Sequence, residues 1–214
     1  MEYRFVWTGF FTVFAALTFC SCSQNDKMRP PAVSFKIQKA PVVPRTPGQM
    51  GREVGIKVSY MPKNTYARKR ASSMRPRFIT IHSTANPKGD ANAHSRYLNS
   101  GKSRSLNWHF TVDQFGAYQH IPTTETGHHA DHSGPGDQYS VAIEMCECTT
   151  HNPVVIYNKT AKLAALDGQV FLDETEDTYC VCPAPLMTNG RPGYKWSWFI
   201  SRVDYYYRCL QAGR

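Results

Sequence analysis

The segment Phe78-Ile79-Thr80-Ile81-His82 is a short β-branched run that ends in a polar residue. Runs of this kind predict a buried strand, because branched and aromatic side chains pack well on a pleated surface. His82 stands where the strand ends and is followed by Ser83-Thr84-Ala85. A side chain at a strand end is held rigidly and can still face a cleft, which suits a metal ligand. A histidine that is only hydrogen-bonded within the fold is the alternative interpretation of this position.

Further periodic segments lie on the carboxyl side of this strand. Helical spacing is predicted over 91–98, closed by Asn99-Ser100-Gly101, and again over roughly 157–166 and 195–210. Strands are predicted over 108–112 and 117–121, joined by a turn at 113–116, and the run 139–146 is also apolar. Strands interleaved with helices predict an α/β fold: a single layered domain with a mixed central β-sheet flanked by helices, over residues 77–214.

The charge of the chain is divided unevenly. The 214 residues carry a formal net charge of +9, but residues 1–77 hold 14 of the 25 Lys and Arg residues and only three of the 16 acids. The remainder of the chain is slightly acidic, so the basic charge does not indicate a nucleic-acid-binding domain. Residues 23–76 are basic and contain seven of the 14 prolines, which predicts a linker that is either a solvated spacer or a tether on anionic polymer or lipid.

The first 22 residues have the pattern of an export signal. Arg4 precedes an apolar run from Phe5 to Phe19, and Cys20-Ser21-Cys22 follows. The run is shorter than the roughly 20 residues of a membrane span. A bacterial lipoprotein signal acylated at Cys22 and an ordinary signal peptide both fit, and both predict a protein of the cell envelope, anchored to a membrane or released.

Seven of the eight histidines fall between His82 and His132, and five of these seven lie within motifs that follow one another in a recognisable order. The chain resembles the zinc-dependent N-acetylmuramoyl-L-alanine amidases, the family of phage lysozyme-like amidases and peptidoglycan recognition proteins. The motifs that carry the resemblance are 81–86 (Ile-His-Ser-Thr-Ala-Asn), 107–113, 118–122, 127–131, 140–144 (Ser-Val-Ala-Ile-Glu) and Cys182-Pro183.

The resemblance implies a peptidoglycan hydrolase that acts as a monomer. It implies that His82 and Cys182 bind Zn²⁺, that Glu144 assists the catalytic water, and that Trp108, His109 and His129 line the substrate groove. The reaction implied is cleavage of the amide bond between N-acetylmuramic acid and the L-alanine of the stem peptide. Zinc with three protein ligands leaves a position for water and lowers its pKa, and a carboxylate can take up the proton.

The chain departs from the family before Cys182, because it has no histidine after His151 and the family's second ligand histidine is absent. Glu174, eight residues before Cys182, is one candidate replacement, since zinc accepts carboxylate oxygen. A degenerate site that binds peptidoglycan without cutting it is another interpretation, and an error in the gene over 167–181 is a third. Cys180 also stands where the family often has lysine. The two Cys-x-Cys pairs have a spacing that is unusual for a four-cysteine zinc site, and a Cys148–Cys180 disulfide is at least as plausible.

Overall fold

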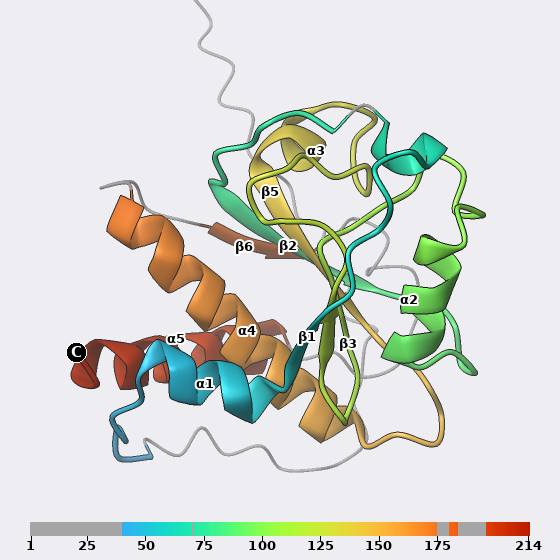
Figure 1. Cartoon of the computed structure of the whole chain (residues 1–214). Coiled ribbons are helices and arrows are strands. Elements are labelled where there is room, and N and C mark those ends of the chain that lie inside the picture. Colours follow the sequence, from blue (N-terminus) through green and yellow to red (C-terminus); the bar gives the residue numbers. More distant parts are fainter. Residues whose placement is uncertain (1–39, 70, 175–179, 184–195) are drawn as a thin grey trace, which may run out of the picture.

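The computed structural model describes residues 40–69, 71–174, 180–183 and 196–214 (Figure 1). Within these residues, six strands form one sheet in the order β1-β4-β3-β5-β2-β6. Their bounds are β1 Ile56–Val58, β2 Phe78–Ser83, β3 Phe110–Val112, β4 Ala117–Gln119, β5 Ser140–Met145 and β6 Cys180–Pro183. All neighbouring strands run parallel except β3 and β4, which form an antiparallel hairpin. The predicted mixed sheet within an α/β domain is therefore confirmed.

Helices cover the two faces of the sheet unequally. The helices are α1 Pro47–Val54, α2 Ala91–Asn99, α3 Pro135–Tyr139, α4 Pro153–Glu174 and α5 Trp196–Ala212. Figure 1 shows α1, α4 and α5 gathered together and α2 standing apart from them. One face of β2 and β5 carries Ile79, Ile81, Val141 and Ile143, which pack into a single core cluster with residues of α1, α4 and α5.

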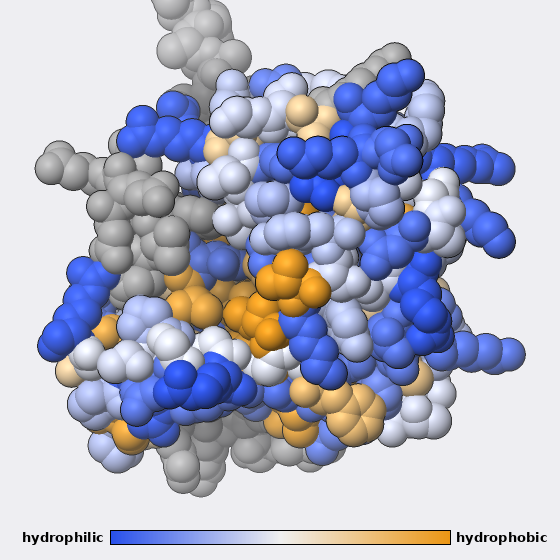
Figure 2. All heavy atoms as spheres, viewed as in Figure 1, coloured by the Kyte–Doolittle hydropathy of each residue, from blue (hydrophilic) through white to orange (hydrophobic). Residues whose placement is uncertain are grey.

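Side chains alternate along a strand, so the residues between these apolar positions face the other way. Thr80 and His82 of β2 and Ala142 and Glu144 of β5 therefore share the opposite face of the sheet. A smaller apolar cluster on that side joins Ala142 to Leu98 of α2 and to Trp108. Figure 2 shows that hydrophilic residues cover most of the face in view, with an apolar patch near its middle.

Residues 40–69 and 71–76 belong to the domain, so the predicted linker is wrong for this part. Thr46 and Gln49 form a capping box at the start of α1, with Pro47 at the first helical position. Gly55 ends the helix with φ of 79°, a left-handed conformation that glycine adopts without a steric cost. Met50 and Val54 are fully buried, and β1 pairs with β4. Residues 23–39 lie outside the described residues.

An ion pair between a buried arginine and a partly buried glutamate ties this N-terminal part to the loop after β4. The Arg68 guanidinium donates to both carboxylate oxygens of Glu125, over 3.0 and 2.9 Å, and to the carbonyl of Met61. Only 5% of Arg68 is exposed. A composition rich in proline and basic residues is typical of a linker, and it predicts one here. Several residues of this segment are nevertheless buried in the domain.

The other elements follow the sequence closely. Helix α4 is longer than the predicted 157–166, β3 begins at Phe110 rather than Trp108, and α3 and β6 were not predicted. Cys146, Cys148 and Cys209 carry free thiols, so the Cys148–Cys180 disulfide is not formed in this structure. Within the described residues, no helix has the length and apolar character needed to cross a membrane.

Candidate active site

His82 and Glu144 lie side by side on neighbouring strands. The parallel register of β2 and β5 pairs these two residues directly, one position before each strand ends. Paired residues of parallel strands share a face, and here it is the face opposite α4 and α5. The carboxyl ends of parallel strands in α/β sheets are where ligands commonly bind. The fold thus brings an imidazole and a carboxylate, 62 positions apart in the chain, to one edge of the sheet.

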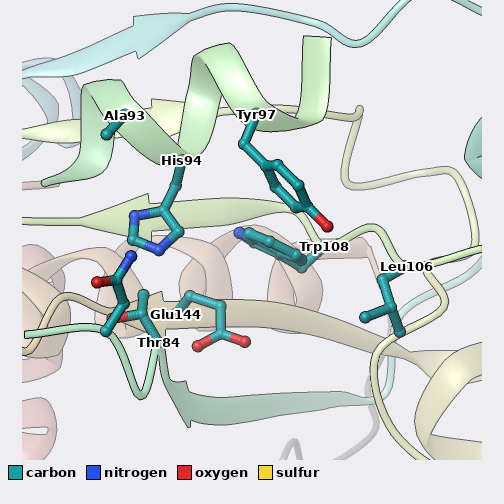
Figure 3. A pocket seen from close by; sticks show the side chains of 8 residues that line it. Thr84, Ala93, His94, Tyr97, Leu106, Trp108 and Glu144 are labelled. Carbon is teal, nitrogen blue, oxygen red and sulfur yellow. The ribbon is translucent and has the colours of Figure 1, made fainter. Parts of the chain in front are cut away.

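A pocket of about 420 Å³ opens at this edge. Its lining comes from β5, from the segment after β2, from α2 and from the segment before β3: Thr84, Asn86, Ala93, His94, Tyr97, Leu106, Trp108 and Glu144. In Figure 3 the Glu144 carboxylate, the His94 ring and the Trp108 ring surround the same space, with Tyr97 on the helix above. The pocket therefore has aromatic walls and a carboxylate at its base.

Glu144 sits in surroundings that favour its neutral form. Burial raises the pKa of its carboxyl group from 4.5 to about 8. Its Oε2 atom is buried and has no hydrogen-bond partner among the described residues. Such a carboxyl group has a pKa close to neutral pH, which is the property that general acid–base catalysis requires.

His82 is held in its neutral form. Only 8% of the residue is exposed, and burial together with the neighbouring His129 lowers its pKa to about 3. Its Nε2 atom lies 3.1 Å from Nδ1 of His129. A neutral imidazole has a lone pair available, so His82 is suited to bind a metal ion.

His129 lies in the loop before α3, and a carboxylate fixes this loop. Asp137 accepts hydrogen bonds from the backbone N–H groups of His129, Ala130 and Ser133, over 2.8–2.9 Å. Although burial opposes it, these hydrogen bonds, led by that of Ser133, hold the pKa of Asp137 below its usual value. Asp131 in turn accepts from the backbone N–H groups of Gly136 and Asp137. The loop is therefore built to hold His129 in one place.

Trp108 and His109 have different environments, although they are adjacent in the sequence. Trp108 lines the pocket, and its indole N–H donates to Oγ1 of Thr111 over 2.7 Å. His109 is fully buried, receives the Ala142 N–H at Nδ1 and donates from Nε2 to the carbonyl of Glu125. Both of its ring nitrogens are occupied within the protein. His109 therefore braces the sheet, and the expectation that it lines the groove does not match its position.

The metal-binding candidates Cys182 and Glu174 are placed only through their backbone. The register of β2 and β6 puts Cys182 beside Thr80, two residues before His82, and Glu174 is the last residue of α4. Their side chains are outside the described residues, among which no three His, Cys, Asp or Glu side chains form a metal-binding group. A neutral His82 with a cysteine on the next strand is a donor set that fits zinc.

Sequence reasoning missed several pocket residues, above all His94 and Tyr97 of α2. His94 and Leu98 are both buried on the inner side of this helix, and their spacing of four residues was a readable sign. The His94 ring bonds through Nδ1 to the carbonyl of Asp90 and packs edge-on against Trp108. Thr84 and Asn86 also line the pocket; both lie in the motif 81–86, although no role in the site was predicted for them.

Comparisons with known proteins agree with this geometry. Residues 72–170 match the family model described as N-acetylmuramoyl-L-alanine amidase. From Bacillus subtilis, the N-acetylmuramoyl-L-alanine amidase XlyA is 47% identical over 78 residues, 35% of this chain, and the amidase CwlH is 41% identical over 98 residues, 44% of this chain. These alignments span 26% and 38% of those two proteins, so the chain corresponds to only part of their length.

Solved structures extend the similarity to nearly complete domains. The structure of the catalytic domain of XlyA has 30% sequence identity to this chain and a TM-score of 0.60. The similarity covers 70% of this chain and 99% of that domain. A mutant endolysin from Bacillus subtilis matches to the same extent. From these similarities and the position of His82 beside Glu144, the chain belongs to the N-acetylmuramoyl-L-alanine amidase family.

Proposed function

We propose that this protein hydrolyses the amide bond between N-acetylmuramic acid and the L-alanine of the peptidoglycan stem peptide. The observation that supports the proposal most is the pairing of His82 with Glu144 beside the pocket, in a chain of this family. A metal-binding imidazole next to a carboxylate with a raised pKa is the combination that metal-assisted amide hydrolysis uses.

His82 and Cys182 would hold a zinc ion at the edge of the sheet. When bound, zinc polarises the scissile carbonyl and lowers the pKa of a water molecule towards 7. Glu144, from the neighbouring strand, would accept a proton from the attacking water and deliver it to the leaving amine. Its raised pKa suits both steps, because a group that titrates near the working pH can accept and release a proton.

The pocket walls would position the substrate. Trp108, Tyr97 and Leu106 present apolar and aromatic surface, while His94 and Asn86 offer polar groups at the other side. A glycan with a peptide attached has both apolar ring faces and many hydrogen-bonding groups, so it matches such a lining. Positioning the amide near Glu144 would give the proton transfer a short path.

A non-catalytic peptidoglycan-binding role is the second candidate, because the family's second ligand histidine is absent from the sequence and no three metal-binding side chains form a group within the described residues. Release of dye-labelled fragments from insoluble peptidoglycan separates the two functions. The amidase proposal expects release by the wild-type chain and loss of release in Glu144→Gln and His82→Ala. Co-sedimentation with peptidoglycan without any release by the wild-type chain would support the binding role instead.

We also propose that residues 1–22 direct export and that Cys22 carries a lipid anchor. The pattern of an apolar run followed by Cys20-Ser21-Cys22 supports this. An anchored enzyme would act on the cell wall next to its membrane. Labelling of the full chain with radioactive palmitate in a bacterial host tests it, because Cys22→Ser should abolish the label. Equal labelling of both chains would contradict the anchor.

A further inference from the structure

The proposed zinc site lacks one protein ligand. His82 and Cys182 are two of the three that a hydrolytic zinc ion usually takes from the protein. The sequence contains no histidine after His151, so the carboxyl-terminal part of the chain cannot supply an imidazole. A replacement imidazole must therefore come from elsewhere in the fold.

One further imidazole is already next to His82. The Nε2 atom of His82 and the Nδ1 atom of His129 are 3.1 Å apart, and the two ring planes meet at 82°. Two imidazole nitrogens that bind one tetrahedral zinc ion at 2.0–2.1 Å are separated by about 3.3 Å. The observed separation is thus close to that of two ligands on a single ion, and a small movement of one ring would accommodate it.

The position of His129 is fixed by its surroundings. Asp137 accepts the backbone N–H groups of His129 and Ala130, over 2.8 and 2.9 Å. The His129 ring packs against Gly127 so closely that a Cβ atom added there would stand 2.7 Å from its Cδ2. The Nε2 atom is buried and has no hydrogen-bond partner among the described residues. The ring is therefore held with Nδ1 directed at His82, as a ligand held by a preorganised loop would be.

We propose that His129 is the third protein ligand of the zinc ion, together with His82 and Cys182, and replaces the histidine that is missing before Cys182. The inference rests on the proposed zinc site and adds to it the identity of the ligand. His129, which the family resemblance placed in the wall of the substrate groove, is thereby assigned to the metal ion. Glu174, at the end of α4, is the competing candidate.

Zinc affinity of the purified full chain tests this assignment. Affinity is measured by competition with a chromophoric chelator, for the wild type and for His129→Ala, His128→Ala and Glu174→Gln. His128 is the matched control, because it is adjacent in the same loop and its side chain is 31% exposed. Loss of a residue that only supports a ligand costs 10–100-fold in metal affinity, so His129→Ala should weaken binding by more than about 100-fold. His128→Ala and Glu174→Gln should stay within about threefold of the wild type.

A second variant separates a ligand from a structural residue. Cysteine is also a zinc ligand, so His129→Cys should recover much of the lost affinity. With cobalt(II) in place of zinc, the thiolate-to-cobalt absorption that Cys182 gives in the wild type should increase in His129→Cys, because that variant adds a second thiolate ligand. Circular dichroism of each metal-free variant checks that the fold is kept.

The outcomes distinguish failure of the His129 assignment from failure of the proposed zinc site. If the wild type binds zinc and His129→Ala binds it with the same affinity, His129 is not a ligand, and the proposed zinc site still stands. Equal losses in His129→Ala and His129→Cys, or loss of zinc in Glu174→Gln, would overturn the His129 assignment as well. A folded wild-type chain that binds no zinc would refute the zinc mechanism itself, and the assignment of His129 with it.

Discussion

Replacing Arg68 by methionine should lower the free energy of unfolding by about 3 kcal/mol, because it leaves a partly buried carboxylate and a buried carbonyl without their partner. The Arg68 side chain is 4% exposed and that of Glu125 is 19% exposed. The guanidinium donates to both Glu125 carboxylate oxygens and to the carbonyl of Met61, so three interactions are lost together. Removal of one member of a buried pair costs about 3–5 kcal/mol, and the partial exposure of Glu125 places this case at the lower end.

Urea unfolding followed by circular dichroism measures the effect, in Arg68→Met, Glu125→Gln and the double variant. The pair should show a coupling energy of about 1–3 kcal/mol, since the two side chains are in direct contact. Lys69→Met is the matched control, because Lys69 is an exposed basic residue next to Arg68. A change of less than about 0.5 kcal/mol in Arg68→Met, as for ordinary surface sites, would refute the conclusion that residues 61–68 are part of the domain.

Three further predictions concern the site and the buried histidines. Glu144→Gln should reduce turnover about 10²–10⁴-fold, measured by release of labelled peptidoglycan fragments, and should leave zinc content unchanged; turnover near the wild-type level would exclude Glu144 as the proton acceptor. Tyr97→Ala should raise KM for a soluble muropeptide about tenfold with zinc content unchanged, because it removes a pocket wall that contributes about 1.4 kcal/mol of binding free energy. An unchanged KM would mean that the substrate binds elsewhere. Burial lowers the pKa of His109 to about 4 and that of His120 to about 3. These two residues stay neutral in the folded state while the unfolded chain takes up protons below pH 6.5, so stability is lost as the pH falls. Between pH 7 and 5 each should lower the free energy of unfolding of metal-free protein by about 2 kcal/mol, and urea midpoints of the wild type that do not change with pH in this range would contradict it.

The central strands could be predicted from the sequence, because their signal is local. Residues 78–82 and 140–145 are apolar on one side and carry a polar residue near the end, which is the pattern of strands that support a site at the sheet edge. The pairing of His82 with Glu144 then follows once the two strands are neighbours in parallel. The family resemblance, and not a local pattern, indicated that these two strands lie next to each other.

In the N-terminal part the composition and the local helix signals disagree, and the structure follows the local signals. Thr46, Pro47 and Gln49 form a readable helix start, and Gly55 a readable helix end. These signals are present in a segment rich in proline and basic residues, a composition typical of linkers. The buried Met50 and Val54 are spaced by four residues, which was the remaining sign of a helix with an inner face.

The proximity of His129 to His82 could not be predicted from sequence spacing. It depends on the path of the loop between β4 and α3, which Asp137 and Asp131 fix through backbone hydrogen bonds. Loop paths of this kind follow from many weak contacts and have no periodic signature. His109 was expected in the groove because a strand was predicted over 108–112. Strand β3 begins only at Phe110, and the two internal hydrogen bonds of His109 have no signature in the sequence.

The identity of the bond that is cut tests the central claim most directly. Purified peptidoglycan is incubated with the full chain, and new amino groups in the soluble products are labelled and identified by mass spectrometry. The account predicts stem peptides with a free L-alanine amino group and glycan strands with free lactyl carboxylates, in equal amounts, from the wild type and not from Glu144→Gln. The account would be contradicted if all lactyl–alanine bonds stayed intact while the protein was folded, zinc-loaded and bound to peptidoglycan.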